Sequence, residues 1–416
     1  MHRIEADTLI PGEGAPIENG VVLLDGPVIS FAGPAEDAPK TPPDTETTRV
    51  PAVMPGMWET HGHFMGLQTG GIEVEIARTR LPVLASRATK DAETALQAGF
   101  TSVREAGGLG VYLARVVDEG TVPGPHIYGP GAILSQTGGH GDLHGFPLSL
   151  VENLSEEGGY LRVCDGVPEC LLAVREQLRR GAKAIKVCAS GGVMSELDHP
   201  IHQQFSADEL RAIVEEAGRS DRIVMAHCHG KPGIVAALEA GCHTIEHGSY
   251  LDEEVAEMMI QRKALLVPTR FIMERLLKIG REMGVPDYAY EKLVFVAKEH
   301  ERALRTAIKK RVPIALGTDI FSTGEGTAVP WGMNAHELLH LVDAGMTPLQ
   351  ALQSATANGP LTLGPQAPKS GQLREGYDAD VLAVTRNPAS DIAVLTEPEH
   401  ITHIWKDGRL VKSPPT

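Results

Sequence analysis

The sequence has little positive charge. Its 38 lysines and arginines stand against 54 aspartates and glutamates, which gives a formal net charge of −16 at pH 7. Nucleic acids and anionic membranes are bound by clustered lysine and arginine, so this balance argues against both kinds of partner.

The sequence also lacks the apolar segments that carry a chain into a membrane. No apolar stretch reaches the length of a membrane span, and the first residues do not combine a charged region with an apolar one as a signal peptide does. We therefore expect a cytoplasmic protein that does not bind membranes.

Cysteine is scarce and does not form a framework. The five cysteines are odd in number and scattered through strand-like or helix-like segments, at Cys164, Cys170, Cys188, Cys228 and Cys242. Spacing of this kind favours a reduced compartment over a disulfide-stabilised fold.

The middle of the chain alternates short apolar runs with longer amphipathic ones. Eight runs have strand character, at 50–64, 101–106, 126–134, 184–190, 223–229, 244–249, 264–270 and 313–319. Helix-like stretches lie between them, at 81–97, 169–180, 206–217, 232–240, 252–262, 290–311 and 334–344. Strand and helix repeated eight times predict an α/β protein built on a (β/α)8 TIM-like barrel.

Several of the helix-like stretches carry start or stop signals. Ser206 and Glu209 form the pattern of a capping box. Glycine follows four of the stretches, where a left-handed residue ends a helix, at Gly99, Gly181, Gly241 and Gly345.

The two ends of the chain have a different pattern. Residues 1–52 and 366–416 contain short alternating segments broken by Gly, Pro, Asp and Asn, which is typical of antiparallel strands. We expect both ends to form one discontinuous β-sandwich domain, with residues 53–365 forming the barrel domain. The segment 36–48, rich in Pro, Asp and Thr, is predicted to be an exposed loop.

Potential metal ligands fall at the carboxyl ends of the predicted strands, where the loops of a parallel barrel form its active site. They are His61, His63, Lys186, His227, His247 and Asp319. Each has an ordinary explanation by itself, such as a hydrogen-bonded core histidine or a helix-capping aspartate. Their joint occurrence at one rim favours a single site, and imidazole and carboxylate are common ligands of zinc.

Five segments carry a resemblance to a known family. Residues 55–63, which contain His61-Gly62-His63, are similar to the first-strand motif of the metal-dependent amidohydrolase superfamily, and residues 371–381 to the segment that completes its β-sandwich. Residues 138–142, 184–192 and 227–230 resemble its prolidase-like and ochratoxinase-like branch. That branch contains dipeptidases, carboxypeptidases and ochratoxin-hydrolysing amidases. The aspartate that usually precedes the first-strand motif is Thr60 here, with Glu59 one position earlier.

The resemblance implies a centre of two divalent cations, most simply zinc. His61, His63 and Asp319 would hold one cation, and His227 and His247 the other. Lys186 would bridge them as an N-carboxylated lysine, because a buried lysine loses its proton readily and the neutral amine takes up carbon dioxide.

The implied reaction is hydrolysis of an amide C–N bond. A hydroxide shared by the two cations would attack the carbonyl carbon, and Asp319 would take its proton and pass it to the leaving amine. The expected substrate is a small-molecule amide or peptide, such as a dipeptide, an N-acyl amino acid or an ochratoxin-like amide. We expect the enzyme to be a homo-oligomer.

Three further residues are predicted to bind the substrate. His140 lies in the long Gly-rich excursion 135–168, and loops of this length often line a site. His229 shares the strand face of His227. Arg270 ends the seventh predicted strand, where its guanidinium would pair with a substrate carboxylate.

Other functions stay open at this point. A lactone or a cyclic amide would suit the same centre, and a noncatalytic scaffold could keep the fold without the chemistry. His336-Glu337-Leu338-Leu339-His340 matches the zincin metalloprotease pattern, although it falls in the last predicted helix and offers no evident third ligand.

Overall fold

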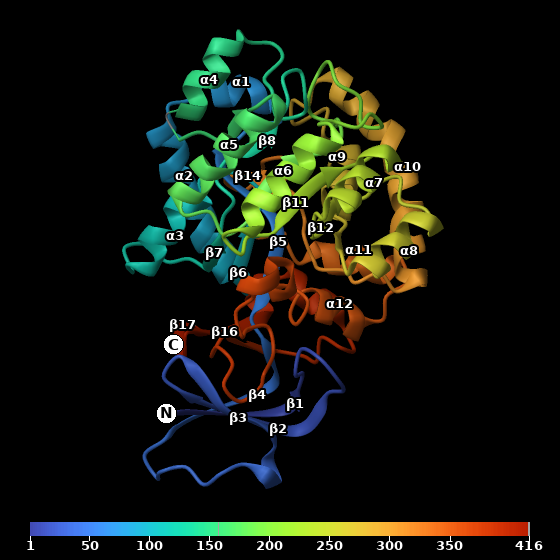
Figure 1. Ribbon diagram of the computed structural model, residues 1–416. Helices are drawn as coiled ribbons and strands as arrows, with labels where there is room; N and C mark the ends of the chain where they lie inside the picture. The colour runs from blue at the N-terminus through green and yellow to red at the C-terminus, as the bar shows by residue number, and fades with distance from the viewer. Residues whose placement is uncertain (157, 415–416) are drawn as a thin grey trace.

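The two ends of the chain meet in one seven-stranded sheet. The structure is a computed structural model that describes residues 1–156 and 158–414. The order of strands is β17-β16-β15-β4-β1-β2-β3. Their bounds are β1 (His2–Leu9), β2 (Ile17–Asp25), β3 (Val28–Pro34), β4 (Glu46–Pro55), β15 (Val381–Val384), β16 (Ile401–Lys406) and β17 (Arg409–Lys412). Figure 1 shows this terminal sheet at the bottom of the molecule, below the helices.

The terminal sheet has its own small core. Ile4, Leu9, Val22, Val381 and Trp405 are among its buried residues. β1 and β4 pair in parallel, and every other neighbouring pair of this sheet is antiparallel. The predicted meeting of the two ends is therefore observed as a single sheet, joined where β4 pairs with β15.

The middle of the chain forms two parallel sheets surrounded by helices. Their orders are β13-β12-β11-β10-β8-β9 and β14-β5-β6-β7. The bounds are β5 (Met57–Leu67), β6 (Phe100–Glu105), β7 (His126–Tyr128), β8 (Ile133–Ser135), β9 (Leu161–Val163), β10 (Ile185–Cys188), β11 (Val224–Cys228), β12 (Thr244–His247), β13 (Leu265–Val267) and β14 (Ile320–Ser322). These parallel sheets confirm the predicted α/β class.

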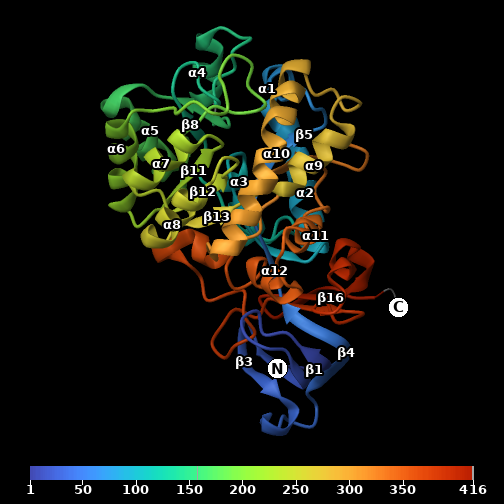
Figure 2. The ribbon, with the colours of Figure 1, turned by 90° about the vertical axis from the view of Figure 1, so that its right-hand side faces the viewer.

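The helices cover the outside of the parallel strands, as the two views in Figures 1 and 2 show. They are α1 (Ile72–Arg78), α2 (Leu81–Gln97), α3 (Gly110–Asp118), α4 (Leu148–Glu156), α5 (Gly166–Arg180), α6 (Ala207–Gly218), α7 (Lys231–Ala240), α8 (Glu253–Arg262), α9 (Arg270–Ile279), α10 (Asp287–Lys310), α11 (His336–Asp343) and α12 (Pro348–Ser354). The capping box is confirmed at α6, where Glu209 N donates to Ser206 Oγ at 3.4 Å. The four glycines predicted to follow helices all have positive φ angles.

The eighth predicted strand, 313–319, is wrong in its extent. Only Ile314 forms a strand bridge, with Leu266, and β14 begins after Asp319. Hydrogen bonds still connect this segment to its two neighbouring strands. Ala315 N donates to Leu266 O of β13 at 3.0 Å, and Thr60 N of β5 donates to Leu316 O at 2.9 Å. Asp319 has a φ of 63°, which interrupts an extended chain.

Three other predicted runs need correction. The run 50–64 covers two strands, β4 and β5, that belong to different sheets. The run 126–134 is divided into β7 and β8 by Pro130, which has no N–H to donate, and by Gly131 with a φ of 76°. The run 264–270 ends at Val267, and Arg270 begins α9.

The predicted excursion 135–168 contains more structure than a loop. It holds α4 and β9, with residue 157 outside the described residues. In both views α1 and α4 lie at the end of the barrel farthest from the terminal sheet (Figures 1 and 2). The sequence reasoning also missed α1, α3, α9 and α12.

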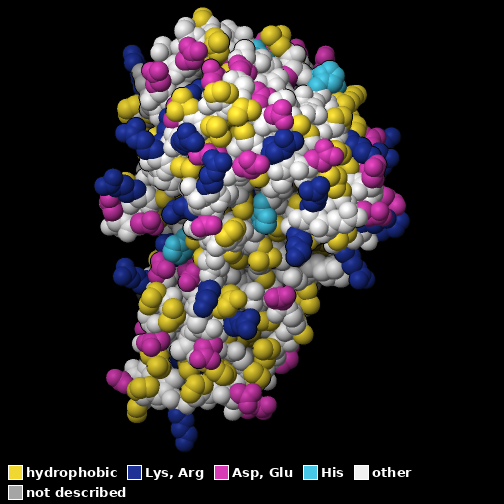
Figure 3. Space-filling view, viewed as in Figure 1, with side chains coloured by type: hydrophobic (Ala, Val, Ile, Leu, Met, Phe, Trp, Pro, Cys, Tyr) yellow, Lys and Arg dark blue, Asp and Glu magenta, His cyan; other side chains and the backbone are white. Residues whose placement is uncertain are grey.

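The surface carries both signs of charge. Figure 3 shows Lys and Arg side chains interspersed with Asp and Glu on the face that it presents, rather than gathered into a basic patch. Within the described ranges, no helix combines the length and the apolar character that a membrane crossing needs.

Candidate metal centre

Two histidines project from β5, all eleven residues of which are buried. His61 Nδ1 lies 2.6 Å from Glu246 Oε2, and His63 Nδ1 lies 2.7 Å from Gly107 O. Because a carbonyl and an ionised carboxylate only accept, Nδ1 carries the hydrogen in both rings. The Nε2 atoms of the neutral imidazoles therefore present lone pairs to the cavity.

Gly62 separates the two histidines because a side chain would not fit. A Cβ atom at this position would lie 2.6 Å from the Trp331 ring. That ring stacks on Phe64 with 4.3 Å between ring centroids, and its Nε1 donates to His63 O at 3.3 Å. The Gly in His-x-His thus allows Trp331 to pack directly on β5.

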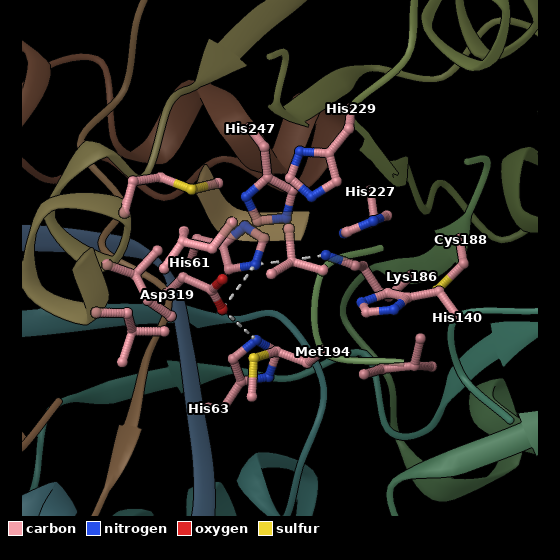
Figure 4. Close-up of a pocket in the computed structure, with 16 residues that line it drawn as sticks. His61, His63, His140, Lys186, Cys188, Met194, His227, His229, His247 and Asp319 are labelled. Atoms are coloured by element: carbon pink, nitrogen blue, oxygen red, sulfur yellow. Dashed lines mark hydrogen bonds and ion pairs between the residues drawn. The ribbon is translucent and has the colours of Figure 1, made fainter. Parts of the chain in front are cut away.

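Asp319 faces both histidines (Figure 4). Its Oδ1 lies 3.0 Å from His63 Nε2 and 3.6 Å from His61 Nε2. His61, His247 and Asp319 each offer a ligand atom within 4.8 Å of the other two. Lone pairs that face a carboxylate oxygen need a proton or a cation between them, and this nitrogen and oxygen donor set suits a divalent cation such as zinc.

Two of these residues have unusual backbone conformations. His247 and Asp319 have φ angles of 66° and 63°, and Thr269, whose Oγ1 lies 2.7 Å from His247 Nδ1, has a φ of 54°. Residues other than glycine rarely adopt this left-handed conformation, and it concentrates at functional sites. The hydrogen bond from Asp319 N to His61 O, at 2.6 Å, helps to hold the aspartate there.

Lys186 comes from β10 and is only 2 % exposed. Its Nζ lies 3.5 Å from His61 Nε2, and it forms no ion pair with a residue that the structure describes. Burial lowers the pKa of this amine. The neutral form that carbamate formation needs is therefore favoured.

His227 and His229 lie on β11 and at its end. The His227 ring is 4.7 Å from the His247 ring, and its Nε2 donates to Gly191 O at 3.2 Å, which leaves Nδ1 as the lone-pair atom. Burial lowers the pKa of His229 to about 3 and that of His61 to about 4, and it lowers the pKa values of His227 and His247 as well. All four rings are thus neutral at pH 7, as metal ligation requires.

His140 is brought to the cavity by the excursion after β8. Its ring stacks on His227 with 4.2 Å between centroids, and its Nδ1 lies 2.8 Å from Ser195 Oγ. Ser195 Oγ in turn donates to Asp198 Oδ1. Lys292 of α10 donates to Ser195 O at 2.7 Å and lies 3.3 Å from Asp198 Oδ1. No local pattern in the sequence connects these residues, because His140 lies 55 positions before Ser195 and Lys292 lies 97 positions after it.

A buried ion pair supports His61 from behind. Arg104 Nη2 lies 2.9 Å and 3.0 Å from the two carboxylate oxygens of Glu246, and both side chains are fully buried. Although burial opposes ionisation, Arg104 holds the pKa of Glu246 at about 2. The sequence reasoning missed this pair. The available signal was a glutamate directly before His247.

Glu59 connects β5 to the segment that precedes Asp319. Its Oε1 accepts from His61 N at 2.8 Å and from Thr318 N at 3.0 Å, while its Oε2 accepts from Asn334 Nδ2 at 2.7 Å. This glutamate stands one position before the family's usual aspartate. It fixes the backbone beside His61 and beside Asp319.

The cavity has one polar wall and one apolar wall. The histidines, Lys186 and Asp319 face a wall of Ile133, Val193, Met194, Ile272, Met273 and Leu276. A second pocket shares His63, His140 and Asp319 with the first and continues to Met65, Ile76, Leu143, Leu161 and Phe321. Glu73 lies at its edge, where burial raises the pKa of the carboxyl group. The site can therefore hold an apolar group next to its metal-ligand side chains.

Arg270 does not line this cavity. It is the first residue of α9, and its guanidinium contacts Glu274, the carbonyl of Ala297 at 2.8 Å and His300 Nδ1 at 3.3 Å. These partners direct it between α9 and α10. Its placement does not support the predicted contact with a substrate carboxylate.

The zincin-like segment serves another purpose. Glu337 is fully buried and accepts from Arg270 N at 2.9 Å and from Phe271 N, at the start of α9. Within the described part of the chain, neither His336 nor His340 belongs to a group of three potential metal ligands. Glu337 thus satisfies free amides at a helix N-terminus.

Comparisons with known proteins agree with this geometry. The model of a family described as the Amidohydrolase family matches residues 52–411. The chain is 45 % identical to ochratoxinase of Aspergillus niger over 99 % of this chain and 86 % of that protein, and the crystal structure of that enzyme superposes with a TM-score of 0.90, covering 99 % and 96 % of the two chains. A crystal structure of a prolidase complexed with N-methylphosphonate-L-proline has 33 % identity and a TM-score of 0.90, covering 99 % of each chain.

Proposed function

Because the chain belongs to the amidohydrolase family, we propose that it is a metal-dependent hydrolase that cleaves an amide C–N bond. The observation that carries the proposal is the meeting of neutral histidines, Asp319 and a buried lysine around one cavity. The lysine makes no ion pair with any of the described residues. Proteins use this mixture of nitrogen and oxygen donors to hold two divalent cations in hydrolytic sites.

The proposed ligand set is the one that the sequence suggested. In this assignment His61, His63 and Asp319 would hold one cation, His227 and His247 would hold the other, and Lys186, once its amine is carboxylated, would be a ligand to both. When bound, two cations of the zinc type polarise a carbonyl group and make water a stronger nucleophile. The neutral rings and the lowered pKa of Lys186 support this assignment.

Asp319 is the proposed proton carrier. Burial opposes its ionisation, but the adjacent His63 ring and the neighbouring His61 ring lower the pKa of the carboxyl group, so the carboxylate is available as a base. It takes a proton from the attacking water and delivers it to the nitrogen of the leaving amine. Its side chain is 21 % exposed, which lets it reach a bound substrate.

The substrate in this proposal is an amide with an apolar group. The apolar wall and the adjoining pocket exclude water from one side of the site, and His140 and His229 orient polar atoms of the substrate. Ochratoxinase and prolidase among the similar proteins point to a dipeptide, an N-acyl amino acid or an ochratoxin-like amide. Arg270 is left out of the proposed binding site.

The proposal extends to the organisation of the chain. Residues 53–365 form the catalytic barrel, and residues 1–52 and 366–416 form the second domain as a β-sandwich. The hydrogen bonds of residues 313–316 with β13 and β5 support closure of the barrel through this segment. The cytoplasmic location and the homo-oligomeric state stay predictions.

A hydrolysis screen tests the function. Zinc-loaded protein is incubated with N-acyl amino acids, Xaa-Pro dipeptides, aromatic amides and lactones, and product amines and acids are quantified by mass spectrometry. We expect amide cleavage that disappears after chelation and returns with zinc. Lactone cleavage without amide cleavage would replace the proposal by the lactonase alternative. A protein that takes up no zinc and hydrolyses none of these substrates after zinc treatment would favour a scaffold.

A further inference from the structure

A second group of metal-ligand side chains lies where the barrel meets the terminal sheet. His126 starts β7, Asp380 directly precedes β15, and Asp407 lies in the turn between β16 and β17. Each offers a ligand atom within 4.8 Å of the other two. None of them lines the cavity described above, and His126 lies at the beginning of its strand, whereas the cavity lies at the strands' carboxyl ends.

Two buried atoms of this group have no hydrogen-bond partner within the described residues. They are Asp380 Oδ2 and His126 Nε2. Asp380 is only 3 % exposed, so its free oxygen is removed from bulk water. A buried carboxylate oxygen without a partner costs free energy, and structures rarely leave one unsatisfied. Asp380 Oδ2 faces His126 Nε2, so both atoms point to one place.

The distances fit a cation better than a direct hydrogen bond. His126 Nε2 lies 3.5 Å from Asp380 Oδ2 and 3.4 Å from Asp407 Oδ1. Hydrogen bonds between nitrogen and oxygen span about 2.7–3.2 Å. Two ligands that are each roughly 2.0–2.2 Å from a tetrahedral zinc ion lie about 3.3–3.6 Å apart, whereas neighbouring ligands of an octahedral ion at that radius lie about 2.8–3.1 Å apart.

The surroundings carry an excess of negative charge. A third carboxylate, Asp378, lies nearby, and burial together with the charge of Asp380 raises its pKa to about 6. Lys406 Nζ lies 3.3 Å from Asp407 Oδ2 and compensates one charge. Burial lowers the pKa of His126, but the two aspartates outweigh it and raise the pKa to about 9, so a proton competes with a cation for this ring.

The turn that carries Asp407 is rigid. Asp407 N donates to Asp380 Oδ1 at 2.9 Å, and Gly408 N donates to Ala379 O at 2.9 Å. Gly408 has a φ of 69°, and a Cβ atom there would lie 1.8 Å from Gly26 O. The three ligand atoms are thus positioned by the fold itself, which lowers the cost of binding an ion.

We propose that His126, Asp380 and Asp407 form a zinc-type cation site that fastens the barrel to the terminal sheet, with water as the fourth ligand. Carboxylate oxygen and imidazole nitrogen are both ligand atoms that zinc accepts, and the ion would displace the proton of the His126 ring. An ion that binds only the folded chain raises its stability in proportion to the logarithm of the ion concentration. The site does not depend on amide hydrolysis.

The test compares the full-length protein with Asp407→Asn and His126→Asn. Asparagine tolerates the left-handed conformation that Asp407 has, with a φ of 51°, so the turn is kept. Asp25→Asn, an exposed aspartate at the end of β2, is the matched control. Zinc per chain is measured by mass spectrometry after equilibration with a small molar excess of zinc over all sites and removal of unbound zinc. The unfolding midpoint is followed with and without zinc.

We expect both variants to contain one zinc equivalent fewer than the wild type and the control, and to lose part of the zinc-dependent rise in the unfolding midpoint. Zinc content equal to that of the wild type in both variants overturns the proposal. The titration of the His126 ring is also followed by nuclear magnetic resonance in the presence of zinc. A ring that still titrates near its raised pKa would show that a proton occupies the site instead of zinc, and would overturn the proposal. Lys186→Met is expected to lose cations from the cavity only. If adding Asp407→Asn to that variant removes one further zinc equivalent, the two sites bind zinc independently.

Discussion

Arg104 and Glu246 form an ion pair that has no contact with solvent. The same carboxylate accepts a hydrogen bond from His61, whose Nδ1 lies 2.6 Å from Glu246 Oε2. The ring orientation of His61, a proposed metal ligand, is therefore fixed through Glu246 by a guanidinium on the neighbouring strand.

Replacing Glu246 by Gln removes the charge but keeps the shape. We expect the unfolding free energy to fall by about 3–5 kcal/mol, because Arg104 is left buried and unpaired, and zinc affinity to fall by about 10–100-fold, because His61 loses its orienting carboxylate. Denaturant unfolding and a zinc titration measure the two effects. Glu239→Gln, an exposed glutamate of α7, is the control and should change neither.

Replacing Lys186 by Met keeps the length of the side chain without the amine. We expect loss of at least one cavity zinc equivalent and loss of turnover, because no carbamate can form. Metal analysis and a rate measurement on the substrate found in the screen check this. Lys183→Met, at an exposed position three residues earlier, should retain both. A Lys186→Met protein with full metal content and rate would reject the bridging role.

Ser195→Ala should loosen His140 without removing it. A single hydrogen bond contributes about 0.5–1.5 kcal/mol, which corresponds to a fall of about 2–12-fold in kcat/KM. The zinc content should stay unchanged, since Ser195 contacts none of the proposed ligands. Ser220→Ala, on the exposed surface after α6, is the comparison. Equal kinetics in the two variants would show that His140 needs no such support.

Glu105 makes stability depend on pH. It is fully buried and accepts from Gly110 N, and burial raises the pKa of its carboxyl group to about 8. The folded state holds the proton more tightly than the unfolded state, so stability falls as pH rises from about 4.5 to about 8. At about 1.36 kcal/mol per pKa unit this loss reaches about 5 kcal/mol at most.

Glu105→Gln should therefore flatten that part of the pH profile. The amide oxygen still accepts from the backbone, while the ionisable group is gone. The midpoints of urea unfolding are measured between pH 5 and 8, because the pKa of Glu105 rises from 4.5 to about 8 on folding. A slope identical to that of the wild type would assign the pH dependence to other groups.

His336→Ala tests the zincin alternative. Because His336 Nδ1 lies 3.0 Å from Met333 O and Glu337 caps α9, we expect the zinc content and the rate to stay at wild-type values. Loss of a zinc equivalent in this variant would revive the metalloprotease interpretation.

The sequence predicted the class of fold because parallel strands of a barrel are buried on both faces and stand out as short apolar runs. It also placed the histidines, Lys186 and Asp319 at one rim, since the strand ends of a barrel converge. The eighth strand was the exception. There Gly317 packs against His61, and Asp319 turns the chain with a positive φ. Neither feature produces a periodic pattern of apolar residues from which it could be predicted.

The supporting residues were harder to predict. Arg104 and Glu246 are charged residues in apolar strands, and only the fold reveals that they pair. Arg270 was predicted to end a strand, but β13 ends three residues earlier and Arg270 is the first residue of α9. A shift of a few residues is enough to move a side chain from one face of the barrel wall to the other.

The irregular segment before β14 has a mechanical consequence. Asp319 N donates a hydrogen bond to His61 O, and the preceding Thr318 N donates one to Glu59, so the position of Asp319 follows β5. A substitution that displaces β5 is therefore expected to displace His61, His63 and Asp319 together. Glu246 of β12 also holds His61 Nδ1 at 2.6 Å, so this group is tied to the strand that ends at His247 as well.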